Sequence, residues 1–260
     1  MPIWLRRLAA GAVKLETMVR VLRPVPVEKL KLLVFDLDGT LIDSAQDLCN
    51  SVNAALLEFG HTALPDPAIA SFVGNGAQML VRRSLAAASG LAPEAVEQKL
   101  LDDTLAFFLR YYRAHKLDFT YAYEGVLEAL TALKQLHDAP GTPQRAMAVL
   151  TNKPVRPAQG ICAGLGMADY FTHIYGGDSF AAKKPDPMGL LTLMAEVGTT
   201  PEETVMIGDS RVDMQTARNA GAWAVGCAFG FGPQNLMETP PDVVVDRASE
   251  WTTLLTPPAR

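Results

Sequence analysis

The sequence has few cysteines and lacks any long apolar run. Its three cysteines, Cys49, Cys162 and Cys227, are widely spaced and odd in number. This pattern argues against a disulfide framework and favours reduced thiols in a cytoplasmic protein. No apolar run approaches the roughly 18 residues that a membrane span requires. We therefore expect a protein without stable membrane insertion.

Acidic residues outnumber basic residues. A formal net charge of -5 and a pI near 5.4 argue against a nucleic-acid-binding surface. A small phosphorylated molecule remains a possible ligand. Residues 1–29 differ from the rest, because basic residues predominate there and Pro24 and Pro26 close the segment. We expect a poorly ordered basic leader, with a start at Met18 or a helix on a membrane surface as alternatives.

The pattern from Ser44 to about His115 is helical. Apolar residues recur there at steps of three and four, as in Leu48, Val52, Ala55, Leu56 and Phe59. Glycines and prolines divide the region into about four helices with short loops, and strand signals are lacking. This pattern predicts a small helical bundle.

After Tyr123 helices alternate with short apolar runs. The runs are "AMAVLT", "FTHIYGG", "TVMIGDS", "WAVGCAFG" and "DVVVD". Such alternation predicts a parallel sheet with helices on both faces, and the run Leu32 to Phe35 belongs to the same sheet. We therefore predict an α/β protein with a doubly wound, Rossmann-like core at 30–46 and 120–260, and a helical insertion at 47–119.

Polar residues follow the apolar runs at the points where the predicted strands end. Open parallel sheets bind ligands outside the carboxyl ends of their strands, so these residues are expected to converge on one site. The residues are Asp36, Asp38, Gly39, Thr40, Thr151, Asn152, Lys153, Lys183, Lys184, Asp209, Ser210 and Asp213.

This set of residues suits the hydrolysis of a phosphate monoester. Carboxylates approach a phosphate dianion only with a cation to offset the repulsion, and hard oxygen ligands around phosphate favour Mg²⁺. One Asp can then attack phosphorus, and a second acid can move the protons. Thr151, Asn152 and a lysine would stabilise the charge on the phosphoryl oxygens.

Four segments in order, "DLDGTLIDS", "LTNK", "KKPDP" and "GDSRVD", resemble the motifs of the haloacid dehalogenase-like phosphatases. The resemblance extends from about Leu32 to Asp246. Within that superfamily the chain is most similar to the phosphoglycolate phosphatases, because the helical insertion carries "FVGNGAQMLVRRSL". The insertion would then be a cap that closes over the site and excludes water.

The resemblance implies a role for each motif residue. Asp36 would be the nucleophile and Asp38 the general acid and base. Thr151, Asn152 and Lys184 would bind the phosphoryl group, whereas Lys183 would be solvated. Mg²⁺ would be held by the Asp36 carboxylate, the Asp38 backbone carbonyl and Asp209. Asp213 would either support these ligands without touching the metal or act as an occasional ligand. Gly39 and Gly208 would let backbone amides approach the phosphate. In the cap, Asn75 and Arg83 would contact the substrate, Arg83 through a substrate carboxylate.

The resemblance leaves the substrate open. We expect hydrolysis of 2-phosphoglycolate to glycolate and phosphate, with a phosphatase for a sugar phosphate or pyrophosphate as the nearest alternative. A phosphomutase on the same scaffold and a phospho-accepting signalling module are the others. Monomer and homodimer stay equally open.

Overall fold

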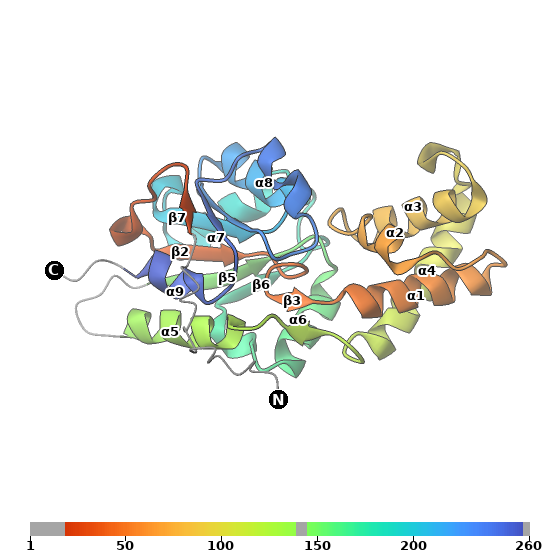
Figure 1. Cartoon of the computed structure of the whole chain (residues 1–260), viewed down its shortest axis with the longest axis horizontal. Coiled ribbons are helices and arrows are strands. Elements are labelled where there is room, and N and C mark those ends of the chain that lie inside the picture. Colours follow the sequence, from red (N-terminus) through yellow and green to blue (C-terminus); the bar gives the residue numbers. More distant parts are fainter. Residues whose placement is uncertain (1–18, 139–144, 257–260) are drawn as a thin grey trace, which may run out of the picture.

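The computed structural model describes residues 19–138 and 145–256. Its centre is a seven-stranded sheet in which every neighbouring pair is parallel except β1 and β9 (Figure 1). The predicted α/β fold with an inserted helical cap is confirmed. In spatial order the strands are β1 (Arg20–Val21), β9 (Val243–Val245), β8 (Trp223–Cys227), β7 (Thr204–Gly208), β2 (Leu32–Phe35), β5 (Ala146–Leu150) and β6 (His173–Tyr175).

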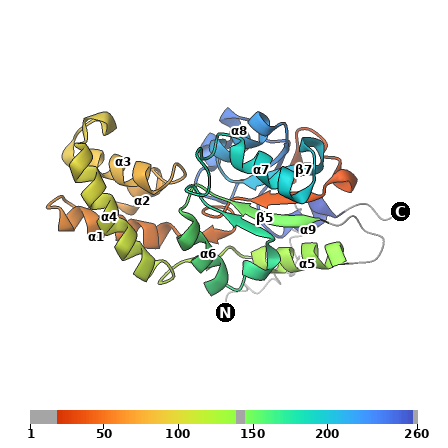
Figure 2. The ribbon, with the colours of Figure 1, turned by 180° about the vertical axis from the view of Figure 1, so that it is seen from behind.

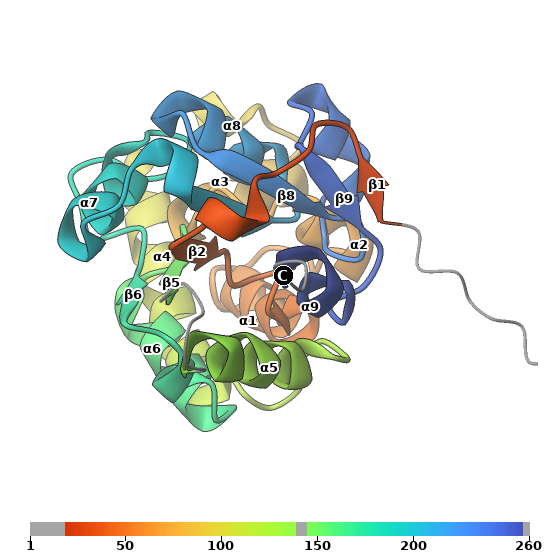
Figure 3. The ribbon, with the colours of Figure 1, turned by 90° about the vertical axis from the view of Figure 1, so that its left-hand side faces the viewer.

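Helices cover both faces of the sheet, as Figure 3 shows along the strand direction. Helices α7 (Met188–Val197) and α8 (Arg211–Ala220) pack on one face with Leu32 and Val34 of the central strand. Helices α5 (Val126–Asp138), α6 (Val155–Gly164) and α9 (Glu250–Leu255) pack on the other with Leu33 and Phe35. Because successive strand residues point to opposite faces, a strand buried on both sides is apolar throughout.

The cap is a separate group of helices beside the sheet (Figures 1 and 2). It is joined to the core by two short antiparallel strands, β3 (Ile42–Asp43) and β4 (Tyr121–Ala122). Its elements are α1 (Ala45–Glu58), α2 (Asp66–Ala70), α3 (Ala77–Ser89), the 3₁₀ helix η2 (Pro93–Ala95) and α4 (Gln98–His115). The four α-helices agree in number with the predicted bundle.

A buried carboxylate ties the two ends of the cap together. Asp47, in the first turn of α1, accepts hydrogen bonds from the backbone N–H of Phe119 and of Thr120 and from the Thr120 hydroxyl, at 2.7–3.1 Å. Its side chain is buried. The chain thus enters and leaves the cap at one clamped point.

Residues 19–29 differ from the expected leader, whose first part, residues 1–18, lies outside the described residues. They form β1 and the 3₁₀ helix η1 (Val27–Lys29). Arg23 holds this segment to the core, because its guanidinium pairs with Asp242 at 2.5 Å and lies 4.3 Å from the ring centroid of Trp223. The remaining 3₁₀ helices are η3 (Ala168–Tyr170), η4 (Pro201–Glu203) and η5 (Pro233–Glu238).

Two further expectations concern the cysteines and the membrane. Cys49, Cys162 and Cys227 are free and buried. Among the described residues, no helix is both long and apolar enough to cross a membrane.

Candidate active site

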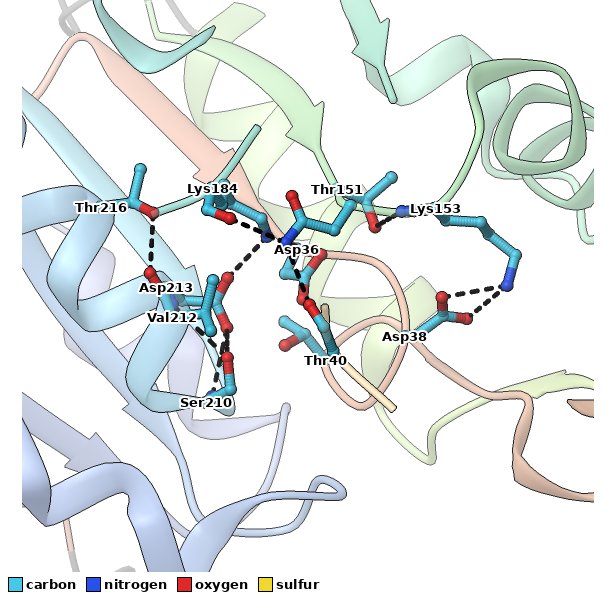
Figure 4. Close-up of polar contacts among 12 residues, drawn as sticks. Asp36, Asp38, Thr40, Thr151, Lys153, Lys184, Ser210, Val212, Asp213 and Thr216 are labelled. Atoms are coloured by element: carbon cyan, nitrogen blue, oxygen red, sulfur yellow. Dashed lines mark hydrogen bonds and ion pairs between the residues drawn. The ribbon is translucent and has the colours of Figure 1, made fainter. Parts of the chain in front are cut away.

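Three carboxylates meet where the central strands end, and Figure 4 labels two of them, Asp36 and Asp213. Asp36 directly follows β2, Asp209 directly follows β7, and Asp213 lies in the first turn of α8. Each offers a carboxylate oxygen within 4.8 Å of the others, and all three residues are buried. The sequence predicted this convergence from the strand ends alone.

Lys184 is the cation beside these carboxylates. Its Nζ lies 2.9 Å from Oδ1 of Asp36 and 2.6 Å from Oδ1 of Asp213, and the side chain is buried. In the described part of the chain, three carboxylates share one ammonium group, so the cluster carries more negative than positive charge. Burial and the Asp213 carboxylate raise the pKa of Asp36 to about 6, although Lys184 opposes them. Burial, Asp213 and Asp36 together raise the pKa of Asp209 to about 8. A bound cation would relieve this repulsion.

The three carboxylates differ in which of their oxygens already accept hydrogen bonds or form ion pairs. Asp213 is held on both oxygens, since Lys184 binds Oδ1 and the Ser210 backbone N–H and hydroxyl donate to Oδ2. Asp209 is held mainly on Oδ2, which accepts the backbone N–H groups of Phe231 at 2.7 Å and Gly232 at 3.2 Å. Among the described residues, Oδ1 of Asp209 has a single, long contact of 3.4 Å from the Thr40 hydroxyl. Asp209 is therefore the better placed of the two to offer an oxygen to a cation.

Gly39 and Gly208 lie against these carboxylates. Gly39 has φ +83°, and a Cβ there would be 2.3 Å from Oδ2 of Asp209. A Cβ on Gly208 would be 2.3 Å from Cβ of Asp213. Both positions thus need glycine because a carboxylate side chain passes close by, a reason different from the predicted approach of backbone amides to phosphate.

Asp38 belongs to a second polar group, which points away from Asp36 (Figure 4). Its carboxylate accepts a hydrogen bond from the Ser44 hydroxyl at 2.6 Å and pairs through both oxygens with Nζ of Lys153, at 2.9 and 3.0 Å. Lys153 was predicted to reach this edge of the sheet, but no role was assigned to it. Its position directly after Thr151 and Asn152 was the available signal.

Thr151 and Asn152 lie beside the carboxylates at the end of β5, and both are buried. The Thr151 hydroxyl accepts the backbone N–H of Lys153 at 3.2 Å, so its own proton can be donated elsewhere. The Asn152 amide group donates to the carbonyls of Gly74 and Lys184, both at 3.0 Å. In the described part of the chain, no hydrogen bond engages the Asn152 backbone N–H.

The cap residues lie on the opposite wall of the site. Arg83 donates from Nη1 to Oδ1 of Asn75 at 2.9 Å and to the Phe72 carbonyl at 3.3 Å, which orders the loop that contains Asn75. Lys183, exposed as expected, also donates to the Asn75 carbonyl at 2.8 Å. Core and cap together enclose a cavity of about 300 Å³, whose lining includes Asp36, Asp38, Asn75, Arg83, Tyr112 and Lys153.

Two donors of the site were not expected from the sequence. The N–H groups of Phe231 and Gly232 that hold Asp209 follow β8, the strand next to β7. The glycine-rich segment after "WAVGC" at the end of that strand was the signal.

Comparison with known proteins agrees with this geometry. The sequence profile of the haloacid dehalogenase-like hydrolases matches residues 33–227. A phosphoglycolate phosphatase of Pseudomonas putida is 39% identical over 217 residues, which cover 83% of this chain and 76% of that protein. One from Photobacterium profundum is 35% identical over 86% of this chain and 94% of its own length. A crystal structure described as a predicted phosphoglycolate phosphatase of Haemophilus somnus superimposes with a TM-score of 0.80 at 29% identity, over 88% of this chain and 99% of that one.

Proposed function

Since the chain belongs to the haloacid dehalogenase-like hydrolases and is a phosphatase, we propose that it hydrolyses phosphate monoesters with Mg²⁺ through an aspartyl-phosphate intermediate. The first candidate substrate is 2-phosphoglycolate, which would give glycolate and phosphate. The observation that carries the mechanism is the position of Asp36, which lines the cavity beside Lys184 and Asp209.

Asp36 is the proposed nucleophile. Its carboxylate oxygen forms a bond to phosphorus while the bond from phosphorus to the ester oxygen breaks. Asp38 gives a proton to the departing oxygen. Water then attacks the phosphorus of the aspartyl phosphate, Asp38 takes a proton from that water, and inorganic phosphate leaves with the Asp36 carboxylate restored.

Asp36 and Asp209 are the proposed side-chain ligands of Mg²⁺, together with the backbone carbonyl of Asp38. The surplus negative charge of the cluster and the oxygen-only donor set support this assignment. Asp213 would hold Lys184 and the start of α8 in place, because both its oxygens already accept hydrogen bonds. When bound, Mg²⁺ would offset the repulsion between the nucleophile and the phosphate dianion.

The transferred phosphoryl group would be bound by Lys184, the Thr151 hydroxyl and the Asn152 backbone N–H. Lys184 supplies charge, and the other two supply donors that the described contacts leave available. The Asn152 side chain has a structural role in this proposal, because its amide group already donates to the carbonyls of Lys184 and of Gly74 in the cap loop.

For the remainder of the substrate, we propose Arg83 and Asn75 as the groups that bind its carboxylate. Arg83 lines the cavity and forms no ion pair with a described carboxylate. The names of the relatives favour 2-phosphoglycolate, whereas a sugar phosphate, pyrophosphate or a phosphomutase reaction are the alternatives. The three free thiols support a cytoplasmic location.

A panel of phosphate esters tests the substrate. Phosphate release would be measured with 2-phosphoglycolate, hexose phosphates and pyrophosphate, each with Mg²⁺ and with a chelator. We expect the highest kcat/KM for 2-phosphoglycolate and no turnover with the chelator. A preference for a hexose phosphate, or isomerisation without phosphate release, would overturn the choice of substrate.

A further inference from the structure

Lys153 connects three parts of the molecule that lie far apart in the sequence. It follows β5 in the core, and its Nζ binds both carboxylate oxygens of Asp38. The same Nζ lies 4.7 Å from the ring centroid of Tyr112 in helix α4 of the cap. Lys153 is 6% exposed and Tyr112 2% exposed. The ammonium group is thus enclosed between a carboxylate of the core and an aromatic ring of the cap.

The Tyr112 ring is itself fixed. It stacks on Phe108 one turn earlier, with ring centroids 5.7 Å apart and an interplanar angle of 3°. Burial is the main cause that raises the pKa of the Tyr112 phenol to about 12, so the ring is neutral at physiological pH. A neutral ring attracts a cation over its face, and the attraction strengthens where water is excluded.

The two buried lysines of the site serve different carboxylates. Lys184 binds Asp36, the proposed nucleophile, and Lys153 binds Asp38, the proposed acid and base. Asp38 has one further side-chain partner among the described residues, the hydroxyl of Ser44 at 2.6 Å. Ser44 directly precedes α1, where the chain enters the cap. The orientation of Asp38 therefore depends on one core lysine and on the first residue before the cap.

We propose that Lys153 is a positioning residue that holds the Asp38 carboxylate at the cavity, on the side away from Asp36 where the departing oxygen of an in-line displacement would lie, and that Tyr112 couples this orientation to the contact between cap and core. The proposal rests on the proposed function of Asp38. Without the ammonium group, the Ser44 hydroxyl is the one side-chain partner that the described residues leave to this carboxylate, so its orientation is less restricted, and proton transfer falls steeply when the reacting atoms are misplaced. When the cap moves away, Lys153 loses the aromatic face that encloses it.

Leaving groups of different basicity isolate this role. An alkyl phosphate such as 2-phosphoglycolate needs its departing oxygen protonated, whereas p-nitrophenyl phosphate releases a phenolate that needs little help. For each ester kcat/KM reports steps up to release of the leaving group. We expect Lys153→Met to lower kcat/KM for the alkyl ester about 10- to 100-fold, part of the roughly 10²- to 10⁴-fold typical of general acid catalysis. The loss for p-nitrophenyl phosphate should stay within about threefold, because only proton transfer is impaired.

Equal losses for the two esters, or no loss for either, would overturn the proposal. Lys153→Arg keeps the charge and should recover part of the selective loss, which a merely structural role would not predict. Asp38→Asn removes the acid itself, so we expect it to show the largest loss of kcat/KM for the alkyl ester relative to p-nitrophenyl phosphate. If Asp38→Asn shows the selective loss and Lys153→Met does not, only the role of Lys153 is wrong. If Asp36→Asn retains turnover, the proposed function itself fails.

Tyr112 variants test the coupling to the cap. Tyr112→Phe keeps the ring and should leave the ratio of the two kcat/KM values unchanged, whereas Tyr112→Leu should reproduce part of the Lys153→Met change. Unfolding by urea without Mg²⁺ gives a second measurement. The double variant Lys153→Met, Tyr112→Leu should be less destabilised than the sum of the single variants. Strict additivity together with an unchanged ratio in Tyr112→Leu would refute the coupling.

Discussion

Lys184 and Asp213 form a buried ion pair, with Nζ 2.6 Å from Oδ1. The pair holds Lys184 beside Asp36, whose Oδ1 is 2.9 Å from the same nitrogen. Asp213 is in turn fixed by Ser210, the N-cap residue of α8. The first turn of α8 thus holds the Lys184 ammonium group beside the proposed nucleophile, which follows strand β2.

Replacement of Lys184 should affect both activity and stability. Lys184→Met removes the charge that would stabilise the phosphoryl oxygens, so we expect kcat/KM to fall about 10²- to 10³-fold. It also leaves the buried carboxylates without their ammonium partner, so the free energy of unfolding without Mg²⁺ at pH 8 should fall by about 3–5 kcal/mol. Phosphate release and urea denaturation measure the two effects.

The neighbouring lysine provides the control for the stability measurement. Lys183 is exposed and its ammonium group donates to the Asn75 carbonyl without an ion pair to a described carboxylate, so Lys183→Met should change the free energy of unfolding by less than about 0.5 kcal/mol. Equal destabilisation by the two variants would show that the buried ion pairs of Lys184 contribute no more to stability than the exposed Lys183 does.

Binding of Mg²⁺ should depend on pH. Because the pKa of Asp209 is raised to about 8 and that of Asp36 to about 6, the folded protein without metal holds protons that Mg²⁺ must displace. We expect the dissociation constant of Mg²⁺ to rise, and binding therefore to weaken, by up to about tenfold for each pH unit below pH 8. Calorimetric titration at pH 6, 7 and 8 measures it, and a constant affinity over this range would contradict the prediction.

The same pKa shifts predict how stability without Mg²⁺ varies with pH. Between the ordinary value of 3.8 and the raised values, the folded protein binds more protons at Asp36 and Asp209 than the unfolded chain does. Stability is therefore higher at low pH and should fall by a few kcal/mol, as an order of magnitude, as pH rises from about 4 to 8. Denaturation with a chelator at several pH values checks the sign. Asp209→Asn should remove the part of this fall that lies between pH 6 and 8.

Replacement of the proposed nucleophile should separate chemistry from folding. Asp36→Asn keeps the shape of the side chain and removes the attacking oxygen, so phosphate release should become undetectable while circular dichroism stays that of the folded protein. Mass spectrometry of acid-quenched protein tests the intermediate, since a phosphorylated species should form in the parent protein and not in this variant. A phosphorylated Asp36→Asn protein would place the nucleophile elsewhere.

The fold and the carboxylate cluster were predictable because both follow from local sequence. Leu32 to Phe35 is apolar throughout, as expected for a strand covered on two faces, and Asp36 comes directly after it. The same pattern precedes Asp209. Parallel strands end at a common edge, so the apolar runs alone bring these acids together.

Contacts between distant segments could not be predicted in this way. Lys153 and Asp38 are 115 residues apart, and Asp47 and Phe119 are 72 apart. The first pairing joins two loops of the core and the second joins the two ends of the cap, and no periodicity in the sequence encodes either. Strand β1 was missed for another reason, since it consists of two exposed residues, Arg20 and Val21, too short for a recognisable alternation.

The clamp at Asp47 gives the last prediction. Asp47→Ala leaves the N–H groups of Phe119 and Thr120 without their carboxylate acceptor, and hydrogen bonds to a charged group contribute about 1.5–3 kcal/mol each. We expect the free energy of unfolding to fall by about 2–4 kcal/mol. Asp47→Asn keeps one acceptor oxygen, so its free energy of unfolding should lie between those of the parent protein and Asp47→Ala.

Asp103→Ala is the matched control, because Asp103 is an exposed acid on cap helix α4 whose pair with Lys99 is worth about 0.5 kcal/mol or less. Urea denaturation measures all three variants. Since Asp47 joins the two connections of the cap and lies outside the cavity lining, its loss should also raise KM by loosening cap closure, while p-nitrophenyl phosphate and the alkyl ester are affected alike. A destabilisation no larger than that of Asp103→Ala would show that the strand pair β3 and β4 holds the cap without this carboxylate.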